Sequence, residues 1–291
     1  MSVILAIDLG GTRCRVGVAE AAEPASVQLL EDIPAPRSLP DFLGLLKVRI
    51  ASVGATALGL GIPGLATGSI CRWVPNLPFL DGIDLADELP EVVIGLGNDA
   101  QFSLLAEAHC GAASGLSDAI LLAIGTGIGS SVMTSRTIVA GQGGGACSFG
   151  WATADLEDQG EEISGWLERQ AAGRAFDKLG RGLHLEDGQA LIAAARAGDA
   201  AALAALEWPI QALAAAIGSA VALLDPSAVI IAGGVTGAFD VIEPTLRTAI
   251  DRRLPPHLRG VPILRAQHGA GAGLVGAAFA GATGPNWRTI A

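Results

Sequence analysis

Three glycine-rich turns, each placed after an apolar run, are the segments of this chain best suited to chemistry. They are Asp8-Leu9-Gly10-Gly11-Thr12, Gly125-Thr126-Gly127-Ile128-Gly129 and Gly233-Gly234-Val235. Because glycine has no side chain, the backbone can approach a phosphate and point its N–H groups at it, and threonine hydroxyls add neutral donors. Asp8 could hold a hydrated Mg²⁺, which prefers oxygen ligands. One such turn is more often a plain hairpin, but three of them together predict a phosphate-binding site.

The pair Asn98–Asp99 is a second candidate, because it follows the apolar run Val92–Leu96 and precedes an expected helix. A carboxylate in that position could accept the proton of a hydroxyl nucleophile. Asp and Asn are also favoured as N-caps for local reasons. Taken alone, the pair favours the N-cap, so a catalytic role needs support from the rest of the chain.

Other nucleotide and catalytic motifs fit less well. Gly59-x-Gly61-x-x-Gly64 and Gly271-x-Gly273-x-x-Gly276 match the dinucleotide pattern, but the first does not open a helix and the second leaves no room for a following βαβ half. No P-loop motif and no G-x-S-x-G elbow occurs. The four cysteines lie far apart in the sequence, which indicates small buried hydrophobes rather than a zinc or disulfide framework.

The elements that must position these residues follow from the apolar patterning. An apolar strand, a Gly-Thr turn and a returning strand occur at residues 3–20 and again from residue 119, which indicates an internal duplication. Strands are expected over residues 3–9, 15–20, 27–33, 56–62, 92–96, 119–124, 228–232 and 262–265, with further strands at SSVM and TIV after residue 129. Helices are expected over residues 39–52, 100–111, 161–179, 189–197, 200–224, 239–254 and 273–281.

The composition and charge of the chain limit the classes of protein to which it can belong. The 291 residues are 51% hydrophobic and 16% charged, a length and apolarity that suit two lobes rather than one core. We expect an N-terminal lobe over residues 1–116 and a C-terminal lobe over residues 117–291, whose last helix could pack on the first lobe. A net charge of −11 with scattered basic residues argues against nucleic acid as a partner. No membrane span or signal peptide is expected, which predicts a cytoplasmic protein.

Taken together, these residues resemble the ROK family of repressors and sugar kinases, within the actin-like, hexokinase-type ATPases. The resemblance covers nearly the whole chain. It is carried by Ala6–Val18, Gly61–Gly64, Val74–Pro78, Gly97–Ala100, and by two further segments at Ile124–Val132 and Asp225–Val235. It implies an α/β fold with two lobes of the ribonuclease H-like type and a cleft between them, and the family often forms homodimers.

The resemblance also implies roles for individual residues. Asp99 matches the family's catalytic base, and Asn98 and Asn76 match sugar ligands, as does Glu168 in the segment Gly165–Arg174. Arg13 stands where sugar kinases of the family often have Lys. ATP is the implied cofactor, with Mg²⁺ held through water by Asp8. The implied ATP and phosphate contacts are Asp8, Gly10, Gly11, Thr12, Arg13, Gly125, Thr126, Gly127, Gly129, Gly233 and Gly234.

One segment departs from the family pattern. Where family sugar kinases have a Glu and a His that contact the sugar, this chain has Ser148 and Trp151. The cysteine cluster that binds zinc with that His is absent as well, so no zinc is expected. Ser148 could still bond one sugar hydroxyl. Trp151 could stack on a sugar face or fill the vacated space.

Two functions from different classes follow. The first is an ATP-dependent kinase that phosphorylates a hydroxyl of a hexose or related polyol, with Asp99 as the general base. The second is a non-catalytic sensor of the same fold that binds a sugar or nucleotide. The presence of Asp8, Thr12, Asp99 and Gly127 favours the kinase.

Overall fold

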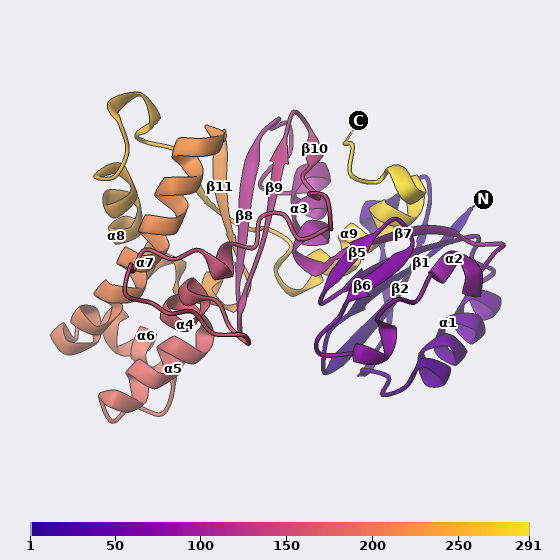
Figure 1. Cartoon of the computed structure of the whole chain (residues 1–291), viewed down its shortest axis with the longest axis horizontal. Helices are drawn as coiled ribbons and strands as arrows, with labels where there is room; N and C mark the ends of the chain where they lie inside the picture. The colour runs from indigo at the N-terminus through magenta and orange to yellow at the C-terminus, as the bar shows by residue number, and fades with distance from the viewer. Residues whose placement is uncertain (1, 291) are drawn as a thin grey trace. The chain divides into compact units, whose positions relative to one another are not determined.

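The computed structural model describes residues 2–290, which form two compact units (Figure 1). The first unit comprises Met1–Leu116, Ser131–Ala146 and Gln267–Ala291, and the second comprises Ser117–Ser130 and Cys147–Ala266. A single division between residues 116 and 117 is expected from the sequence. The compact units differ from that single division because residues 131–146 group with the first unit. Residues 267–291 group with it as well, in line with the expectation that the last helix could pack on the first lobe.

The first unit is built on a five-stranded sheet in the order β3-β2-β1-β4-β7. β1 pairs antiparallel with β2 and parallel with β4, and β4 pairs parallel with β7. The carboxyl ends of β1, β4 and β7 therefore lie at one edge of the sheet. The strands are β1 (Val3–Leu9), β2 (Arg13–Glu20), β3 (Gln28–Pro34), β4 (Ala57–Ile62) and β7 (Val93–Asn98), and a small separate sheet pairs β5 (Leu65–Thr67) with β6 (Ile70–Trp73).

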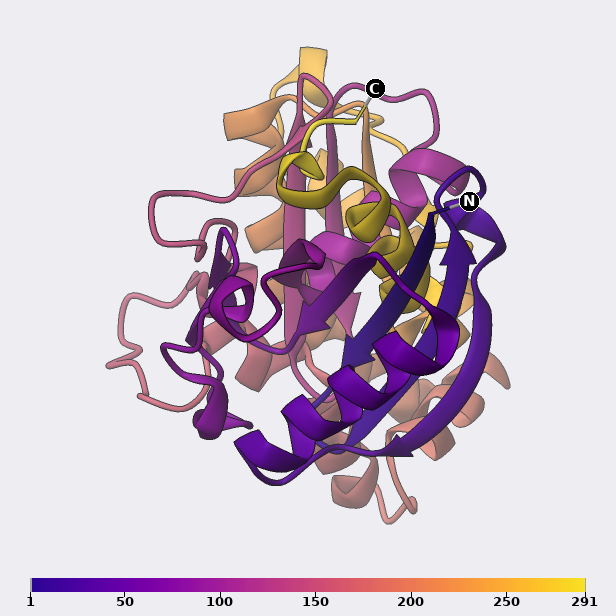
Figure 2. The ribbon, with the colours of Figure 1, turned by 90° about the vertical axis from the view of Figure 1, so that its right-hand side faces the viewer.

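Helices cover both faces of this sheet. Leu5 and Ile7 of β1 share a buried cluster with Phe42 of α1, whereas the intervening Ile4 lies against Gly281 of α9. Since alternate residues of a strand point to opposite faces, α1 and α9 pack on opposite sides. Figure 2 shows α1 crossing the strands β1–β3. The helices of this unit are α1 (Leu39–Val53), α2 (Leu85–Glu88), α3 (Asp99–Cys110) and α9 (Ala272–Thr283).

Glycines in two strands let α9 approach the sheet closely. A Cβ atom on Gly59 of β4 would lie 1.7 Å from the carbonyl oxygen of Ala277, and one on Gly95 of β7 would lie 2.2 Å from that of Ala280. No larger residue fits at either position without displacing backbone. The small residues in these strands therefore serve helix packing.

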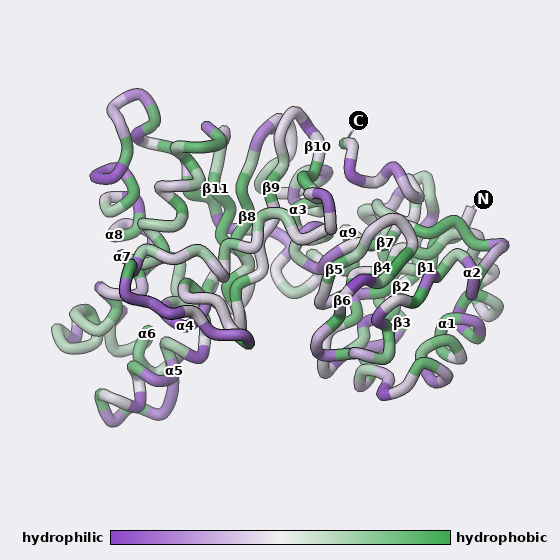
Figure 3. The backbone as a smooth tube through the Cα atoms, in the orientation of Figure 1, coloured by the Kyte–Doolittle hydropathy of each residue, from purple (hydrophilic) through white to green (hydrophobic). Residues whose placement is uncertain are grey.

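The second sheet has the order β10-β9-β8-β11-β12, with β11 parallel to both β8 and β12. The arrangement of a hairpin followed by parallel strands is the same as in the first sheet, in agreement with the expected duplication. In Figure 3 the strands of both sheets are coloured mainly as hydrophobic. The strands are β8 (Ala119–Ile124), β9 (Ile128–Thr134), β10 (Thr137–Ile138), β11 (Ala228–Ala232) and β12 (Ile263–Arg265).

The helix expected over residues 161–179 is wrong in two respects. Residues 161–165 are not helical, and the rest is divided at Ala172, whose backbone is extended. The break has a tertiary cause: the Gly173 N–H donates to the carbonyl oxygen of Gly125 at 2.7 Å, a contact that an uninterrupted helix could not make. The helices of the second unit are α4 (Trp166–Ala171), α5 (Gly173–Gly182), α6 (Gly188–Arg196), α7 (Ala200–Leu224) and α8 (Phe239–Asp251), with short 3₁₀ turns η3 (Phe149–Trp151) and η4 (Gly234–Ala238).

Among the described residues, α7 is the one helix long and apolar enough to pass a length-and-composition test for a membrane span. Half of its most apolar window is buried inside the structure. Buried core helices pass the same test.

Candidate active site

Polar residues gather where the parallel strands of the first sheet end. Asp8 is paired with Gly61 across β1 and β4, and Asn98 is paired with Ile62 across β4 and β7. Asp8 and Asn98 therefore lie on either side of β4 at the same edge. In open α/β sheets this carboxyl edge is where ligands bind.

Asp99 is the first residue of α3, directly after β7. Its side chain is partly buried, and its Oδ1 accepts a hydrogen bond from the Ala100 N–H at 2.7 Å. Burial raises the pKa of this carboxyl to about 6, and the negative charge of Asp8 adds to the rise. A carboxylate with a pKa near neutrality is suited to accept a proton from a hydroxyl group.

Asn98 holds the start of α3 in place. Its Oδ1 accepts from the Ala100 N–H at 2.9 Å, and Gln101 completes a capping box with the Asn98 backbone. Its Nδ2 donates to the carbonyl oxygen of Gly64 at 3.1 Å. The N-cap interpretation is correct for Asn98. Asp99 is not the N-cap but the first residue of the helix.

Asp8 lies between an arginine and the first turn of α9. The Arg15 Nη1 approaches Asp8 Oδ2 at 3.2 Å and also donates to the carbonyl oxygen of Ala270 at 3.1 Å. A Cβ atom on Gly273 would lie 2.7 Å from Asp8 Cγ, so the glycine leaves room for the carboxylate. Burial raises the pKa of Asp8 in spite of the opposing effect of Arg15.

The first glycine turn closes with a hydrogen bond from the Gly10 N–H to the carbonyl oxygen of Arg13 at 2.8 Å. The exposed Asn76 lies beside it, because a Cβ atom on Gly11 would be 3.0 Å from the Asn76 Cβ. Thr12 is exposed. The Arg13 guanidinium binds Asp32, with Nε 2.9 Å from Oδ1, and that ion pair lowers the pKa of Asp32.

The second glycine turn lies in the second unit, between β8 and β9. The Gly125 N–H donates to the carbonyl oxygen of Gly127 at 2.9 Å, which tightens the turn. Glu168 of α4 lies directly against it: a Cβ atom on Gly127 would be 2.3 Å from Glu168 Oε1. Burial raises the pKa of Glu168, and Arg174 opposes the rise. Thr126 is exposed in the turn and Gly129 is part of β9.

The third glycine turn follows β11. Gly233 has φ +82°, and a Cβ atom there would lie 2.5 Å from the carbonyl oxygen of Ile124 at the end of β8, so two features require glycine. Gly234 opens η4 with free space around its Cβ position. Elsewhere in the unit, Ser148 is exposed ahead of η3, and the Trp151 side chain is 48% exposed. Trp151 therefore does not fill a vacated interior space.

A cavity of about 610 Å³ lies within the second unit beside the second and third glycine turns. Its charged and polar lining residues Arg174, Asp177, Gln189 and Arg196 come from α5 and α6 and are not anticipated from the sequence. Asp240 fixes Arg196, because Arg196 Nε and Nη2 bind its two carboxylate oxygens at 2.7 Å. The full lining is Ile124, Gly125, Thr126, Gly173, Arg174, Phe176, Asp177, Gly188, Gln189, Ile192, Arg196, Gly234, Val235, Gly237 and Ala238.

The carboxylates of Asp8 and Asp99 are candidates for holding a metal ion. Asp8 and Asp99 both have raised pKa values, and the charge of Asp8 contributes to the rise at Asp99, so a cation near them would relieve this repulsion. Oxygen donors of this kind fit a hydrated Mg²⁺. Among residues 2–290, no three His, Cys, Asp or Glu side chains come together as a metal site.

Solved structures that superpose on this chain include sugar kinases. A glucokinase from Streptomyces griseus, in complex with glucose and AMPPNP, superposes with a TM-score of 0.78 at 24% identity, covering 97% of this chain and 100% of its own. A hexokinase from Thermus thermophilus superposes with a TM-score of 0.75 at 27% identity, covering 95% of this chain and 97% of its own. The chain therefore has the actin-like, hexokinase-type α/β fold, as predicted.

The family follows from sequence comparison. The model of the ROK family matches residues 4–281. An N-acetyl-D-glucosamine kinase from Pectobacterium atrosepticum is 30% identical over 300 residues, which cover 94% of this chain and 96% of that protein. The chain belongs to the ROK family, and its named relatives include sugar kinases.

Proposed function

We propose that this protein is an ATP-dependent kinase that transfers the γ-phosphoryl group to a hydroxyl of a hexose or a related polyol. The names of its relatives support this class, since they include kinases of N-acetylglucosamine and hexoses. The observation that carries the proposal is the Asp99 carboxylate with its pKa of about 6, at the carboxyl edge of the sheet.

Asp99 acts as the general base in this proposal. At neutral pH it is ionised and accepts the proton of the attacking sugar hydroxyl. As the new P–O bond forms, the bond between the γ-phosphorus and the β-phosphate oxygen breaks and ADP leaves. The hydrogen bond from the Ala100 N–H to Oδ1 fixes the carboxylate. A positioned base of this kind contributes about 10²–10⁴-fold to the rate.

Sugar hydroxyls are bound in this proposal by polar side chains that each unit contributes. In the first unit the proposed contacts are Asn76, which is exposed beside the glycine turn, and Asn98, which directly precedes Asp99. In the second unit Ser148, Trp151 and Glu168 are the proposed contacts, with the half-exposed indole available to stack on a sugar face.

ATP is the proposed phosphoryl donor, and its adenosine part fits the cavity of the second unit. The cavity is large enough for a nucleoside and is bordered by two glycine turns whose N–H groups suit phosphates. Asp8 would hold Mg²⁺ through water. When bound, the metal ion neutralises charge on the transferred phosphoryl group.

A coupled assay of ADP release tests the proposal across hexoses, N-acetylhexosamines and polyols. We expect ADP release that depends on one of these sugars in the wild-type protein and not in Asp99→Asn. Calorimetry should show that the variant still binds ATP. The kinase proposal fails if the wild-type protein binds ATP but releases no ADP with any sugar, a result that would favour a sensor.

A further inference from the structure

The segment between η3 and α4 connects two proposed substrate contacts, Trp151 and Glu168. Residues 152–165 contain no helix or strand, and Figure 3 colours this stretch ahead of α4 mainly as hydrophilic. Its large apolar side chains do not anchor it, because Leu156 is 98% exposed and Ile163 is 91% exposed. Something other than core burial must hold this segment in one conformation.

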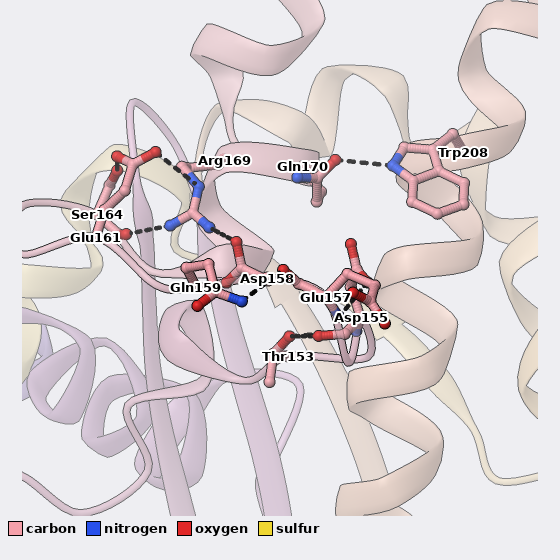
Figure 4. Close-up of polar contacts among 10 residues, drawn as sticks. All are labelled: Thr153, Asp155, Glu157, Asp158, Gln159, Glu161, Ser164, Arg169, Gln170 and Trp208. Carbon is pink, nitrogen blue, oxygen red and sulfur yellow. Dashed lines mark hydrogen bonds and ion pairs between the residues drawn. The ribbon is translucent and has the colours of Figure 1, made fainter.

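Arg169 of α4 binds the segment at three points (Figure 4). Its Nη2 forms an ion pair with Asp158, its Nη1 donates to the carbonyl oxygen of Ser164 at 2.6 Å, and its Nε lies 3.3 Å from an oxygen of Glu161. The side chains of Arg169 and Asp158 are each only 19% exposed. All three guanidinium nitrogens are therefore used on one loop, a geometry that a lysine ammonium could not reproduce.

Arg169 is also the polar anchor of the segment. Other side-chain hydrogen bonds in residues 153–164 are local, such as the Glu157 N–H to Asp155 Oδ1 at 2.9 Å and Gln159 Nε2 to the carbonyl oxygen of Glu157 at 3.2 Å. Within the described chain, the side-chain hydrogen bonds and ion pairs that join residues 153–164 to residues outside the segment end on Arg169. Removing the guanidinium would release the loop.

The ends of the segment are closely packed beside the proposed sugar contacts. A Cβ atom on Gly165 would lie 2.1 Å from the carbonyl oxygen of Gly150, so the start of α4 lies directly on η3. Glu168 Oε2 is near the same turn, 3.5 Å from a Cβ position on Gly150. The loop that Arg169 holds thus joins η3, with Trp151, to the start of α4, with Glu168, and both of its ends lie at this contact.

We propose that Arg169 is a positioning residue for the sugar: its three-point clamp on residues 158–164 fixes Trp151 and Glu168 in the arrangement that binds substrate. This inference rests on the proposed kinase function. Arg169 does not touch the substrate in this scheme, and its effect comes from ordering the loop before the sugar binds. Without the clamp, sugar binding would have to order the loop as well, which weakens binding.

The test compares Arg169→Met and Arg169→Lys with the wild-type protein, by steady-state kinetics and by hydrogen–deuterium exchange. We expect Arg169→Met to raise the KM for the sugar roughly tenfold, to leave the KM for ATP within about twofold, and to speed exchange in residues 153–165. Arg169→Lys should have an intermediate sugar KM, because it keeps the charge but not the three-point contact. A general loss of folded protein would instead lower the activity at all concentrations of both substrates.

Arg247→Met is the matched control, because Arg247 forms an i,i+4 ion pair with Glu243 on α8 and contacts no residue of the loop. It should leave both KM values unchanged. If Arg169→Met does not fold, Asp158→Asn removes one partner of the clamp with little change in shape and should raise the sugar KM in the same direction.

The proposal is overturned if exchange in residues 153–165 is unchanged in Arg169→Met, or if exchange rises while the sugar KM stays within about twofold of wild type. Failure of the kinase function has a different signature. In that case the wild-type protein itself releases no ADP with any sugar, while exchange still reports whether Arg169 holds the loop.

Discussion

Asp99→Asn should lower activity and at the same time stabilise the fold. The folded protein raises the pKa of Asp99 from 3.8 to about 6, mainly by burial. Each pKa unit corresponds to about 1.4 kcal/mol, so keeping the carboxylate ionised in the folded state costs about 3 kcal/mol at neutral pH. Asparagine has a similar shape and no charge, and it avoids this cost.

The pH dependence of that cost follows from the direction of the shift. Because the pKa is higher in the folded state, the folded protein binds the proton more tightly, and stability is lost as the pH rises from about 4 to 6. The cost is absent well below pH 3.8, about half present at pH 5 and complete above pH 6. The stability advantage of Asp99→Asn should therefore be about 1.4 kcal/mol larger at pH 7.5 than at pH 5.

Urea unfolding at pH 5 and pH 7.5 measures the stability, and the ADP-release assay measures turnover. We expect Asp99→Asn to lose about 10²–10⁴-fold in kcat. The kcat/KM of the wild-type protein should fall about tenfold per pH unit below pH 6, because the base becomes protonated. Asp87→Asn, on an exposed position of α2, is the control and should change neither quantity.

Two results would refute this reasoning. Turnover of Asp99→Asn close to that of the wild-type protein would show that another group accepts the proton. An Asp99→Asn variant no more stable than wild type at pH 7.5 would show that burial of this carboxylate does not raise its pKa as described.

Three further substitutions test other parts of the structure. Gly127→Ala places a Cβ atom 2.3 Å from Glu168 Oε1, so Glu168 must move, and the KM for the sugar should rise about tenfold in the ADP-release assay. Glu107→Gln disrupts a fully buried carboxylate that accepts three backbone N–H bonds, two of them from residues 267–268, and should lower the free energy of unfolding by about 2–4 kcal/mol in urea titration. Gly234→Trp fills the cavity from a position with open space around its Cβ, so calorimetry should show ATP affinity reduced at least about tenfold while the melting temperature changes little.

Features that depend on neighbouring residues could be predicted from the sequence. The β1–β2 hairpin and its turn follow from an apolar run ending in Asp8-Leu9-Gly10-Gly11, and α3 follows from the Asn98 cap. The sequence also places Asp8 and Asn98 at the ends of strands, and the structure adds the parallel pairing of β1, β4 and β7 that brings them to one edge. Local signals were sufficient for the parts of the site that lie at strand ends.

Features that depend on contacts between distant residues could not be predicted from the sequence. The break at Ala172 exists because the Gly173 N–H donates a hydrogen bond to the carbonyl oxygen of Gly125. No pattern within residues 161–179 indicates that contact. The cavity that α5 and α6 line also depends on contacts between segments that are distant in the sequence. The pKa of Asp99 depends on burial and on the charge of Asp8, so the sequence could nominate this residue without showing that its environment suits a base.

The position of α9 has a consequence for the order in which the two units can fold during synthesis. On a ribosome the strands of the first sheet emerge before the second unit, but α9, which covers one of its faces and fits against Gly59 and Gly95, emerges after that unit. Residues 147–266, most of the second unit, are synthesised in between and can complete their own core earlier. N-terminal domains usually finish folding first during synthesis. Here the first unit must wait, with one apolar face uncovered, for α9, which follows the second unit in the sequence.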